Sequence, residues 1–242
     1  MLNISPVSRK NLFRKRRVAM FRALVDDYVR LNGICRIIDL GGTIEFWDVW
    51  GHELGETPVE ILCVNIEAQP EVGTVPGIRS IRADARELSD IPDGSYDIAF
   101  SNSVIEHVGR WTDMERFAAE ARRIARSCFI QTPNFWFPFE PHARLPLVHW
   151  LPDPIAYRLH MTARTGFYPK AEDVGSAMDS VQDARLLDQR QFQHLFPDAE
   201  IRGERFIGLT KSLLAIRHDA PGLAQRQPDA KAAGEERRRL CA

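Results

Sequence analysis

The stretch Ile34–Thr43, ICRIIDLGGT, decides the fold. Its apolar run Ile34–Leu40 stops at Gly41 and Gly42, and a run that ends in this way beside an acidic residue is typical of a buried parallel strand. The glycines permit a tight turn through which ligand atoms approach the backbone closely, although such pairs are also frequent in other α/β proteins. We therefore predict a first strand at 34–40, followed by a candidate ligand-binding turn.

Four further apolar runs have the length of strands and are separated by turn-forming residues or helical patterns. They are Val59–Ile66, Ile78–Ala83, Tyr96–Phe100 and Ser127–Thr132. Thr112 and Glu115 have the spacing of a capping box, which predicts a helix from there to about Arg126. Strands that alternate with helices predict an α/β, Rossmann-like fold with a mostly parallel sheet and helices on both faces.

The C-terminal part of the chain completes this sheet. Asp188 is placed to cap a short helix through Leu195. Two later runs are typical of an antiparallel pair at the sheet edge, which gives seven strands with an antiparallel closing strand. These runs are Glu200–Phe206 and Ser212–Arg217. We expect one domain at 34–218, with an insertion at about 133–170, and a disordered tail at 219–242.

An amphipathic helix precedes the first strand. Apolar residues recur at helical spacing from Ser8 to about Leu31, so this helix fills most of residues 1–33. It is either a lid, a packing element, or a basic helix that lies on a membrane surface. Asp26 and Asp27 favour the first two alternatives, because helices at a membrane surface usually carry fewer acidic residues.

Composition excludes several classes of protein. The 242 residues are 44% hydrophobic, and 32 basic side chains nearly balance 33 acidic ones, so the net charge of -1 indicates no nucleic-acid partner. The four cysteines form no CxxC pair, and we expect neither a disulfide framework nor a metal site. Since no continuous apolar segment suggests a leader or a transmembrane span, we expect a cytoplasmic protein, with weak membrane association left open.

Two acidic residues follow the second and third predicted strands. The carboxyl ends of parallel strands border the crevice in which such sheets bind ligands. Glu67 lies roughly 25 residues after the glycine turn, close to the offset at which a carboxylate accepts from ribose hydroxyls. Asp84, which precedes Ala85, is placed to accept from the amine of an adenine. The alternatives are an exposed charge at Glu67 and a turn or helix cap at Asp84.

Five segments together resemble the type 11 group of class I S-adenosylmethionine-dependent methyltransferases. They read DLGGT, VNIE, ADA, YDIAFSNSVIEHV and FIQTPN. The resemblance covers roughly 36–134, and it implies a Rossmann-like methyltransferase fold with S-adenosylmethionine as cofactor. The usual glycine turn of the group has a small residue between two glycines and a further glycine after them, and this chain departs from that pattern.

The resemblance also implies which residues hold the cofactor. The methionine portion is assigned to Asp39, Gly41 and Gly42, and the ribose to Glu67. The adenine is assigned to Asp84 and Ala85. Residues after the fourth strand lie beside the methionine end in this family. These are Ser101, Asn102 and Ser103.

Two alternative functions are an NAD-dependent oxidoreductase and a methyltransferase-like module that binds without turnover. A dinucleotide site needs GxGxxG so that a helix N-terminus meets the pyrophosphate. Here Phe46 and Trp47 occupy the start of the next helix, which favours a donor without phosphate. Intact carboxylates at Glu67 and Asp84 argue for retained cofactor binding.

The acceptor is a small molecule, a lipid or a glycan, and its site is expected in the segment rich in Pro, aromatic residues and His after the fifth strand. If the acceptor is a hydroxyl, His107 and His142 are candidate catalytic bases, because histidine titrates near neutral pH. Candidate substrate-binding residues are Trp136, Glu140, His142 and Arg144. The alternative is that His107 belongs to a structural pair at a helix end and that the aromatic residues only pack.

Overall fold

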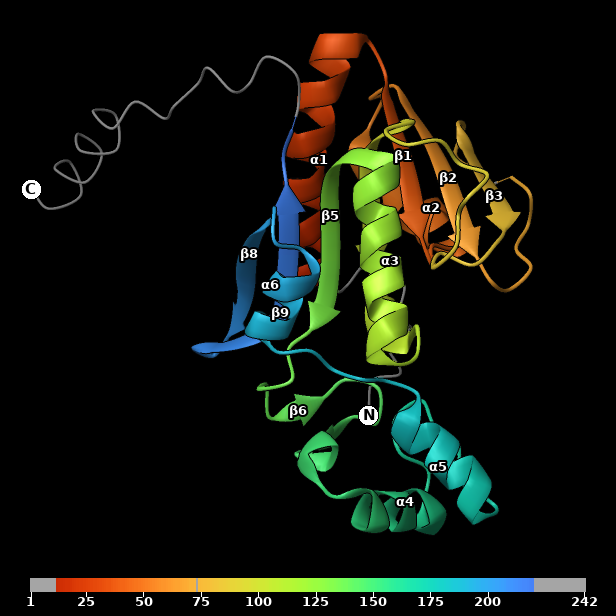
Figure 1. Ribbon diagram of the computed structural model, residues 1–242, viewed down its shortest axis with the longest axis vertical. Helices are drawn as coiled ribbons and strands as arrows, with labels where there is room; N and C mark the ends of the chain where they lie inside the picture. Colours follow the sequence, from red (N-terminus) through yellow and green to blue (C-terminus); the bar gives the residue numbers. More distant parts are fainter. Residues whose placement is uncertain (1–11, 73, 220–242) are drawn as a thin grey trace, which may run out of the picture.

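The computed structural model describes residues 12–72 and 74–219, which form a seven-stranded sheet in the order β3-β2-β1-β4-β5-β9-β8 (Figure 1). Five strands run parallel, and β9 is antiparallel to its neighbours β5 and β8. The strands are β1 (Cys35–Leu40), β2 (Val59–Asn65), β3 (Ile78–Arg82), β4 (Tyr96–Asn102), β5 (Ala125–Pro133), β8 (Glu200–Phe206) and β9 (Leu209–Arg217). The predicted fold, a mostly parallel Rossmann-like sheet with an antiparallel closing strand, is confirmed.

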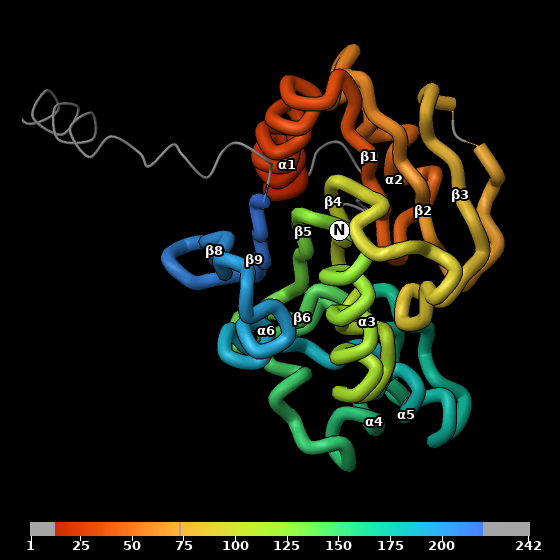
Figure 2. Tube along the Cα trace, turned by 45° about the horizontal axis from the view of Figure 1, so that its top comes forward, coloured from red at the N-terminus to blue at the C-terminus, as the bar shows by residue number. Residues whose placement is uncertain are grey.

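Neighbouring residues of β1 face opposite sides of the sheet, because side chains alternate along a strand. Ile37 packs in a cluster with α1 (Leu12–Asn32), α2 (Ile44–Trp50) and the turn η1 (Gly51–Leu54). Ile38 packs in a second cluster with α3 (Trp111–Ile124) and α6 (Gln189–Leu195). Helices therefore cover both faces of the sheet (Figures 1 and 2).

The two predicted helix caps have different outcomes. Asp188 caps α6 as expected, since its carboxylate accepts from the backbone N–H of Gln191 at 2.9 Å. The capping box at Thr112 is wrong, because α3 begins at Trp111 and Thr112 already lies within its first turn. Asp113 instead accepts from the backbone N–H of Arg110 at 2.9 Å.

An insertion lies below the carboxyl edge of the sheet, between β5 and α6 (Figure 1). Its elements are β6 (Phe139–Glu140), β7 (Leu145–Pro146), η3 (Val148–Trp150), α4 (Asp153–Thr162) and α5 (Val174–Gln182). A short turn, η2 (Ile105–His107), follows β4 on the same side of the sheet. The insertion therefore stands opposite the strand ends at which the sequence places the functional residues.

Three cysteines, Cys35, Cys63 and Cys128, are buried and free, whereas Cys241 lies outside the described residues. The expected tail beyond residue 219 and the start of the expected N-terminal helix before residue 12 also lie outside them. In the part of the chain that the structure describes, no helix has both the length and the apolar character needed to cross a bilayer.

Candidate functional site

The glycine turn is fixed by the neighbouring strand β2. Gly41 has a φ of 78°, which a residue with a side chain rarely adopts, and its N–H donates to the carbonyl of Val64 at 2.8 Å. The side chain of Asn65 donates to the carbonyls of Gly41 and Gly42 at 3.3 and 3.1 Å. Asn65 was given no role in the sequence analysis, although it is the second residue of the VNIE motif.

Asp39 is buried directly before this turn. Its carboxylate accepts a hydrogen bond from the indole Nε1 of Trp47 at 2.7 Å. Burial raises the pKa of Asp39 to about 7, and the Trp47 hydrogen bond opposes this shift only in part. The turn therefore has beside it a carboxyl group that loses its proton easily when a cation lies nearby, because the cation stabilises the carboxylate.

The bulky residues after the turn belong to the core and do not line a ligand crevice. Thr43 caps α2 by accepting from the backbone N–H of Phe46 at 3.2 Å. Phe46 and Trp47 are buried and pack against Phe100 of β4. Two aromatic side chains therefore occupy the first turn of the helix, where a dinucleotide fold keeps space for a pyrophosphate.

The acidic residues after β2 and β3 lie in different surroundings. The side chain of Glu67 is exposed, and its backbone N–H donates to the side-chain oxygen of Asn65 at 2.9 Å. Asp84 is half-buried beside Ala85 and forms a salt bridge with Arg86, whose Nη2 lies 2.6 Å from its carboxylate. The hydrogen bonds from Arg86 hold the pKa of Asp84 below its usual value. The backbone N–H of Arg86 also donates to this carboxylate, as the turn-cap alternative expects.

The three polar residues at the end of β4 all bind neighbouring groups. The hydroxyl of the buried Ser101 donates to the carbonyl of Leu40 at 2.8 Å. Ser103, with a φ of 59°, donates to the side-chain oxygen of Gln131 on β5 at 2.9 Å. Arg17 of α1 donates to the side-chain oxygens of Asn102 and Gln131. The N-terminal helix therefore reaches the carboxyl ends of the central strands.

His107 and His142, the two candidate bases, lie side by side although they come from different loops. Their Nε2 atoms are 3.1 Å apart. The Nδ1 of His142 lies 2.6 Å from the carboxylate of Glu140. The Nδ1 of His107 lies 3.1 Å from the backbone carbonyl of Asp183 and 3.3 Å from its carboxylate. Each imidazole is thus held from its outer side by a residue of the insertion or of the segment that follows α5.

A buried carboxylate, Glu106, completes this cluster. One of its oxygens accepts from the hydroxyl of Thr132 at 3.0 Å, whereas Oε1 has no hydrogen-bond partner among the described residues. Burial raises the pKa of Glu106 even though the two histidines oppose the shift. The sequence had one signal for this residue, its position directly before His107 in the EHV motif.

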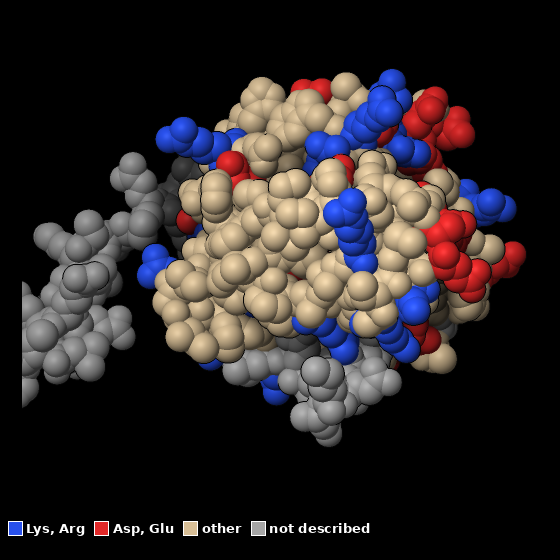
Figure 3. Space-filling model, turned by 90° about the horizontal axis from the view of Figure 1, so that it is seen from below, with Lys and Arg blue, Asp and Glu red and all other residues tan. Residues whose placement is uncertain are grey.

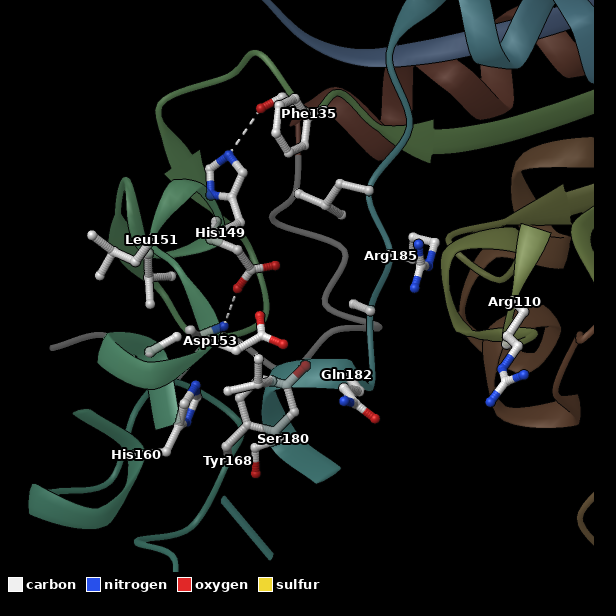
Figure 4. A pocket seen from close by; sticks show the side chains of 18 residues that line it. Arg110, Phe135, His149, Leu151, Asp153, His160, Tyr168, Ser180, Gln182 and Arg185 are labelled. Atoms are coloured by element: carbon white, nitrogen blue, oxygen red, sulfur yellow. Dashed lines mark hydrogen bonds between the residues drawn. The ribbon is translucent and has the colours of Figure 1, made fainter. Parts of the chain in front are cut away.

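A cavity of about 580 Å³ is lined mostly by the insertion, together with Gly109 and Arg110 of the loop that follows β4. In Figure 4, Arg110 and Arg185 lie on one side of it, and His160 and Tyr168 lie on the other. Glu140 also lines it, together with Ala143, the residue after His142. Several lining residues come from α4 and α5, which sequence reasoning did not identify as helices.

The structure does not bring all four predicted substrate-binding residues to this cavity. Glu140 lines it, and His142 is bound to Glu140 at its wall. Trp136 is 63% exposed and lies against Trp150. Arg144 lies over the ring of Phe167, with its guanidinium carbon 4.4 Å from the ring centre. Neither Trp136 nor Arg144 is among the lining residues of the cavity.

Several solved structures are similar to this chain at low sequence identity. The 1,6-didemethyltoxoflavin-N1-methyltransferase of Burkholderia thailandensis, solved with 1,6-didemethyltoxoflavin and S-adenosylhomocysteine, is 12% identical, with a TM-score of 0.48 over 87% of this chain and 82% of that one. The magnesium protoporphyrin IX methyltransferase of Synechocystis PCC 6803, with bound S-adenosylhomocysteine, is 10% identical, with a TM-score of 0.47 over 84% of this chain and 83% of that one.

The chain spans 64% of the length of a methyltransferase assigned to an antibiotic biosynthesis pathway in Anabaena variabilis ATCC 29413. The two are 17% identical over 79% of this chain, with a TM-score of 0.46. At such identities and scores these structures carry no argument about the reaction of this chain. No curated protein matches its sequence.

The family comparison is independent of these structures. Residues 40–127 match the type 11 family model, whose description is "Methyltransferase domain". The matched segment contains the glycine turn and the carboxyl ends of β1, β2, β3 and β4. Over this segment, which is less than half of the chain, the protein is similar to the methyltransferase domain of the type 11 family.

Proposed function

We propose that this protein transfers the methyl group of S-adenosylmethionine to a small-molecule acceptor held in the cavity below the sheet. The observation that carries this proposal is the family match over residues 40–127, because that segment supplies four consecutive strand ends at one edge of the sheet. The cavity supports the second half of the proposal, since it borders the same edge and has the size typical of ligand pockets.

In this proposal the cofactor lies along the ends of β1, β2, β3 and β4. Glu67 accepts from the ribose hydroxyls, and its exposed carboxylate is free to do so from the β2 end. Asp84 and Ala85 hold the adenine, with Arg86 fixing the orientation of the carboxylate. The remaining contacts are to the methionine portion. They come from Asp39, Gly41, Gly42, Ser101, Asn102 and Ser103.

The charge of Asp39 suits the methionine portion, which carries a sulfonium and an ammonium group. The buried carboxyl of Asp39 has a pKa of about 7 in the free protein. A cation close to it favours the carboxylate, so cofactor binding lowers this pKa and releases a proton at neutral pH. Trp47 keeps the carboxyl group oriented toward the turn through its indole hydrogen bond.

Methyl transfer from a sulfonium is an in-line displacement on an activated donor. The acceptor atom forms a bond to the methyl carbon, the C–S bond breaks, and its electron pair stays on sulfur to give S-adenosylhomocysteine. A proton leaves the acceptor to a nearby base or to water. Most of the rate enhancement comes from alignment of the acceptor with the methyl group. Such positioning can lower the activation free energy by up to about 7–11 kcal/mol.

The surface around the insertion favours a weakly charged acceptor. Viewed from below, the described residues on this face are mostly uncharged, with Lys, Arg, Asp and Glu scattered among them or toward the margins (Figure 3). A nucleic-acid acceptor would instead need a continuous basic stripe. Exposed apolar side chains of the insertion include Trp136, Trp150, Leu151, Ile155 and Phe167.

Isothermal titration calorimetry of the purified chain tests the proposal. S-adenosylmethionine and S-adenosylhomocysteine should bind with micromolar affinity, while NADH, used as the control ligand, should not bind. Binding of NADH alone would instead indicate the oxidoreductase. If none of the three ligands binds, the chain is a non-catalytic module.

A further inference from the structure

Three side chains meet close to the cavity, with their ligand atoms near one another. One carboxylate oxygen of Glu106, one nitrogen of His107 and one nitrogen of His142 all lie within 4.8 Å of one another. Glu106 and His107 belong to η2, whereas His142 follows β6, 35 residues further along the chain than His107. The fold therefore converges two loops on one point.

The groups that flank the two imidazoles direct their lone pairs toward each other. Glu140 faces the Nδ1 of His142 at 2.6 Å, so this nitrogen carries the proton. The carbonyl and carboxylate oxygens of Asp183 face the Nδ1 of His107 at 3.1 and 3.3 Å, so the same holds there. In the neutral rings both Nε2 atoms are then bare acceptors, only 3.1 Å apart. Two facing lone pairs need either a proton on one of the rings, which then donates to the other, or a metal ion that both nitrogens bind.

Glu106 adds a carboxyl group to the same point. It is 1% exposed, and its Oε1 has no hydrogen-bond partner among the described residues. A buried carboxylate oxygen that nothing satisfies carries a large desolvation cost unless a cation binds it. The cluster of Glu106, His107 and His142 thus brings together one unsatisfied carboxylate oxygen and two imidazole nitrogens, all of which can donate electron pairs to a metal ion.

We propose that Glu106, His107 and His142 bind one divalent transition-metal ion of the zinc class. Two nitrogens that bind one ion at about 2.0–2.1 Å in tetrahedral geometry lie about 3.3 Å apart, close to the observed 3.1 Å. Two histidines and one glutamate are a donor set that zinc takes at catalytic sites. Mg²⁺ and Ca²⁺ prefer oxygen ligands, and the two imidazoles disfavour them.

The outer partners are those that metal-bound histidines have. A histidine ligand usually donates its second N–H to a carboxylate or carbonyl, which fixes the ring and raises its basicity. Glu140 does this for His142, and Asp183 does it for His107. Tyr168 in turn donates from its hydroxyl to the carboxylate of Asp183 at 2.8 Å. The need to orient two ligand histidines explains why an acidic residue contacts each of them.

Three protein ligands leave the fourth tetrahedral position to water or to the acceptor. The cavity lies close to the cluster, because Glu140, Ala143 and Gly109, close neighbours of the ligands in the chain, line it, although the three ligands themselves do not. Resting on the proposed function, the ion would bind an acceptor through a hydroxyl oxygen and make its proton easier to lose. The acceptor class is then a small molecule with a hydroxyl group.

Titration of the full chain with Zn²⁺ tests the site. Bound metal is first removed with a chelator, and the chelator is then removed. Calorimetry with Zn²⁺ should show saturable binding at one ion per chain, and Mg²⁺ should give no heat. His107→Ala and His142→Ala should each weaken Zn²⁺ binding by more than about 10-fold, because each removes one ligand. Glu106→Gln should weaken it less while keeping the side chain's shape. His52→Ala, which removes an exposed histidine on η1, is the matched control and should bind as the wild type does.

The visible spectrum of bound Co²⁺ gives a second measurement that does not depend on stability. Its d–d bands should change in His107→Ala and His142→Ala but not in His52→Ala. Equal Zn²⁺ binding by all of these proteins, or no saturable binding to a stripped chain that still binds S-adenosylmethionine, overturns the metal site and leaves the proposed methyl transfer intact. If the stripped chain binds Zn²⁺ but not S-adenosylmethionine, the metal site is supported and the proposed methyl transfer is overturned.

Discussion

Arg17 on α1 and Glu204 on β8 form a buried salt bridge across 187 residues of sequence, with Nε and Oε1 2.9 Å apart. Each side chain is only 8% exposed. Arg17 also donates to the side-chain oxygens of Asn102 and Gln131. The N-terminal helix is thereby bound to three strands at the carboxyl edge of the sheet.

Replacement of Arg17 should therefore destabilise the fold strongly. Arg17→Met keeps much of the side-chain volume but leaves the charge of Glu204 buried, and one of its oxygens already has no hydrogen-bond partner among the described residues. We expect a loss of about 3–5 kcal/mol in the free energy of unfolding, measured by urea denaturation. Glu204→Gln should cost less, because Arg17 keeps two amide oxygens as partners. A loss below about 1 kcal/mol for Arg17→Met would contradict this account.

Gly41 should tolerate a side chain much less than Gly33, although both have a φ of 78°. A Cβ at Gly33 meets nothing within 4 Å, whereas a Cβ at Gly41 would overlap both methyl groups of Val104. Gly33→Ala should cost about 1–2 kcal/mol for the left-handed backbone alone. Gly41→Ala should cost a further 1–3 kcal/mol, roughly, for overpacking. Thermal unfolding of both variants measures the difference.

Val104→Ala provides the control for this comparison. In the Gly41→Ala background it should return part of the lost stability, because it removes the two methyl groups that the new Cβ meets. In the Gly33→Ala background the two effects should simply add. Equal losses for the two glycine variants would mean that the turn relaxes away from Val104.

The strands of the central sheet were predictable because each is a short apolar run, and the first three are followed by a glycine or an acidic residue. The predicted first strand at 34–40 and β1 (Cys35–Leu40) differ by one residue. The cap at Thr112 could not be corrected from the sequence, because only the backbone geometry makes Arg110 the N-cap and lets Asp113 accept from its N–H. The helices α4 and α5 were missed, since the prolines and aromatic residues around them are equally typical of a loop.

The strand-end positions of the candidate site could be read from the sequence, but the partners of those residues could not. Arg17 is buried against strands that are 85 and 114 residues away, and no local pattern in the sequence indicates these partners. His107 and His142 were each proposed as bases, while their pairing depends on how the loop after β5 folds back. Asp183 had no local signal, because its role exists only through contact with His107.

Asp39 should make the stability of the free protein fall as the pH rises. Its pKa is raised by burial from 3.8 to about 7, so the protonated form is favoured in the folded state. Between about pH 4 and pH 7 the unfolded chain ionises this group and the folded chain does not, which costs stability as the pH rises. The full difference corresponds to about 4 kcal/mol above pH 7.

Asp39→Asn removes this dependence and keeps an acceptor for the indole of Trp47. The variant should therefore gain stability over the wild type as the pH increases from 4 to 8, with little difference at pH 4. Urea denaturation of both proteins at several pH values gives the difference, in which the titration of other groups cancels. A gain that is the same at all pH values would show that Asp39 ionises normally.

Glu67→Ala should weaken the binding of S-adenosylmethionine without changing the stability of the fold. The side chain is exposed at the carboxyl end of β2, so its removal leaves no cavity. Loss of charge-assisted hydrogen bonds to the ribose should cost about 1–3 kcal/mol, which calorimetry measures as roughly a 5- to 150-fold increase in Kd. Glu56→Ala is the matched control, because Glu56 is an exposed glutamate just before the amino end of the same strand. Unchanged affinity in Glu67→Ala would contradict the assignment of the ribose to Glu67. Weaker binding in both variants would indicate a general effect of negative charge on a cationic ligand.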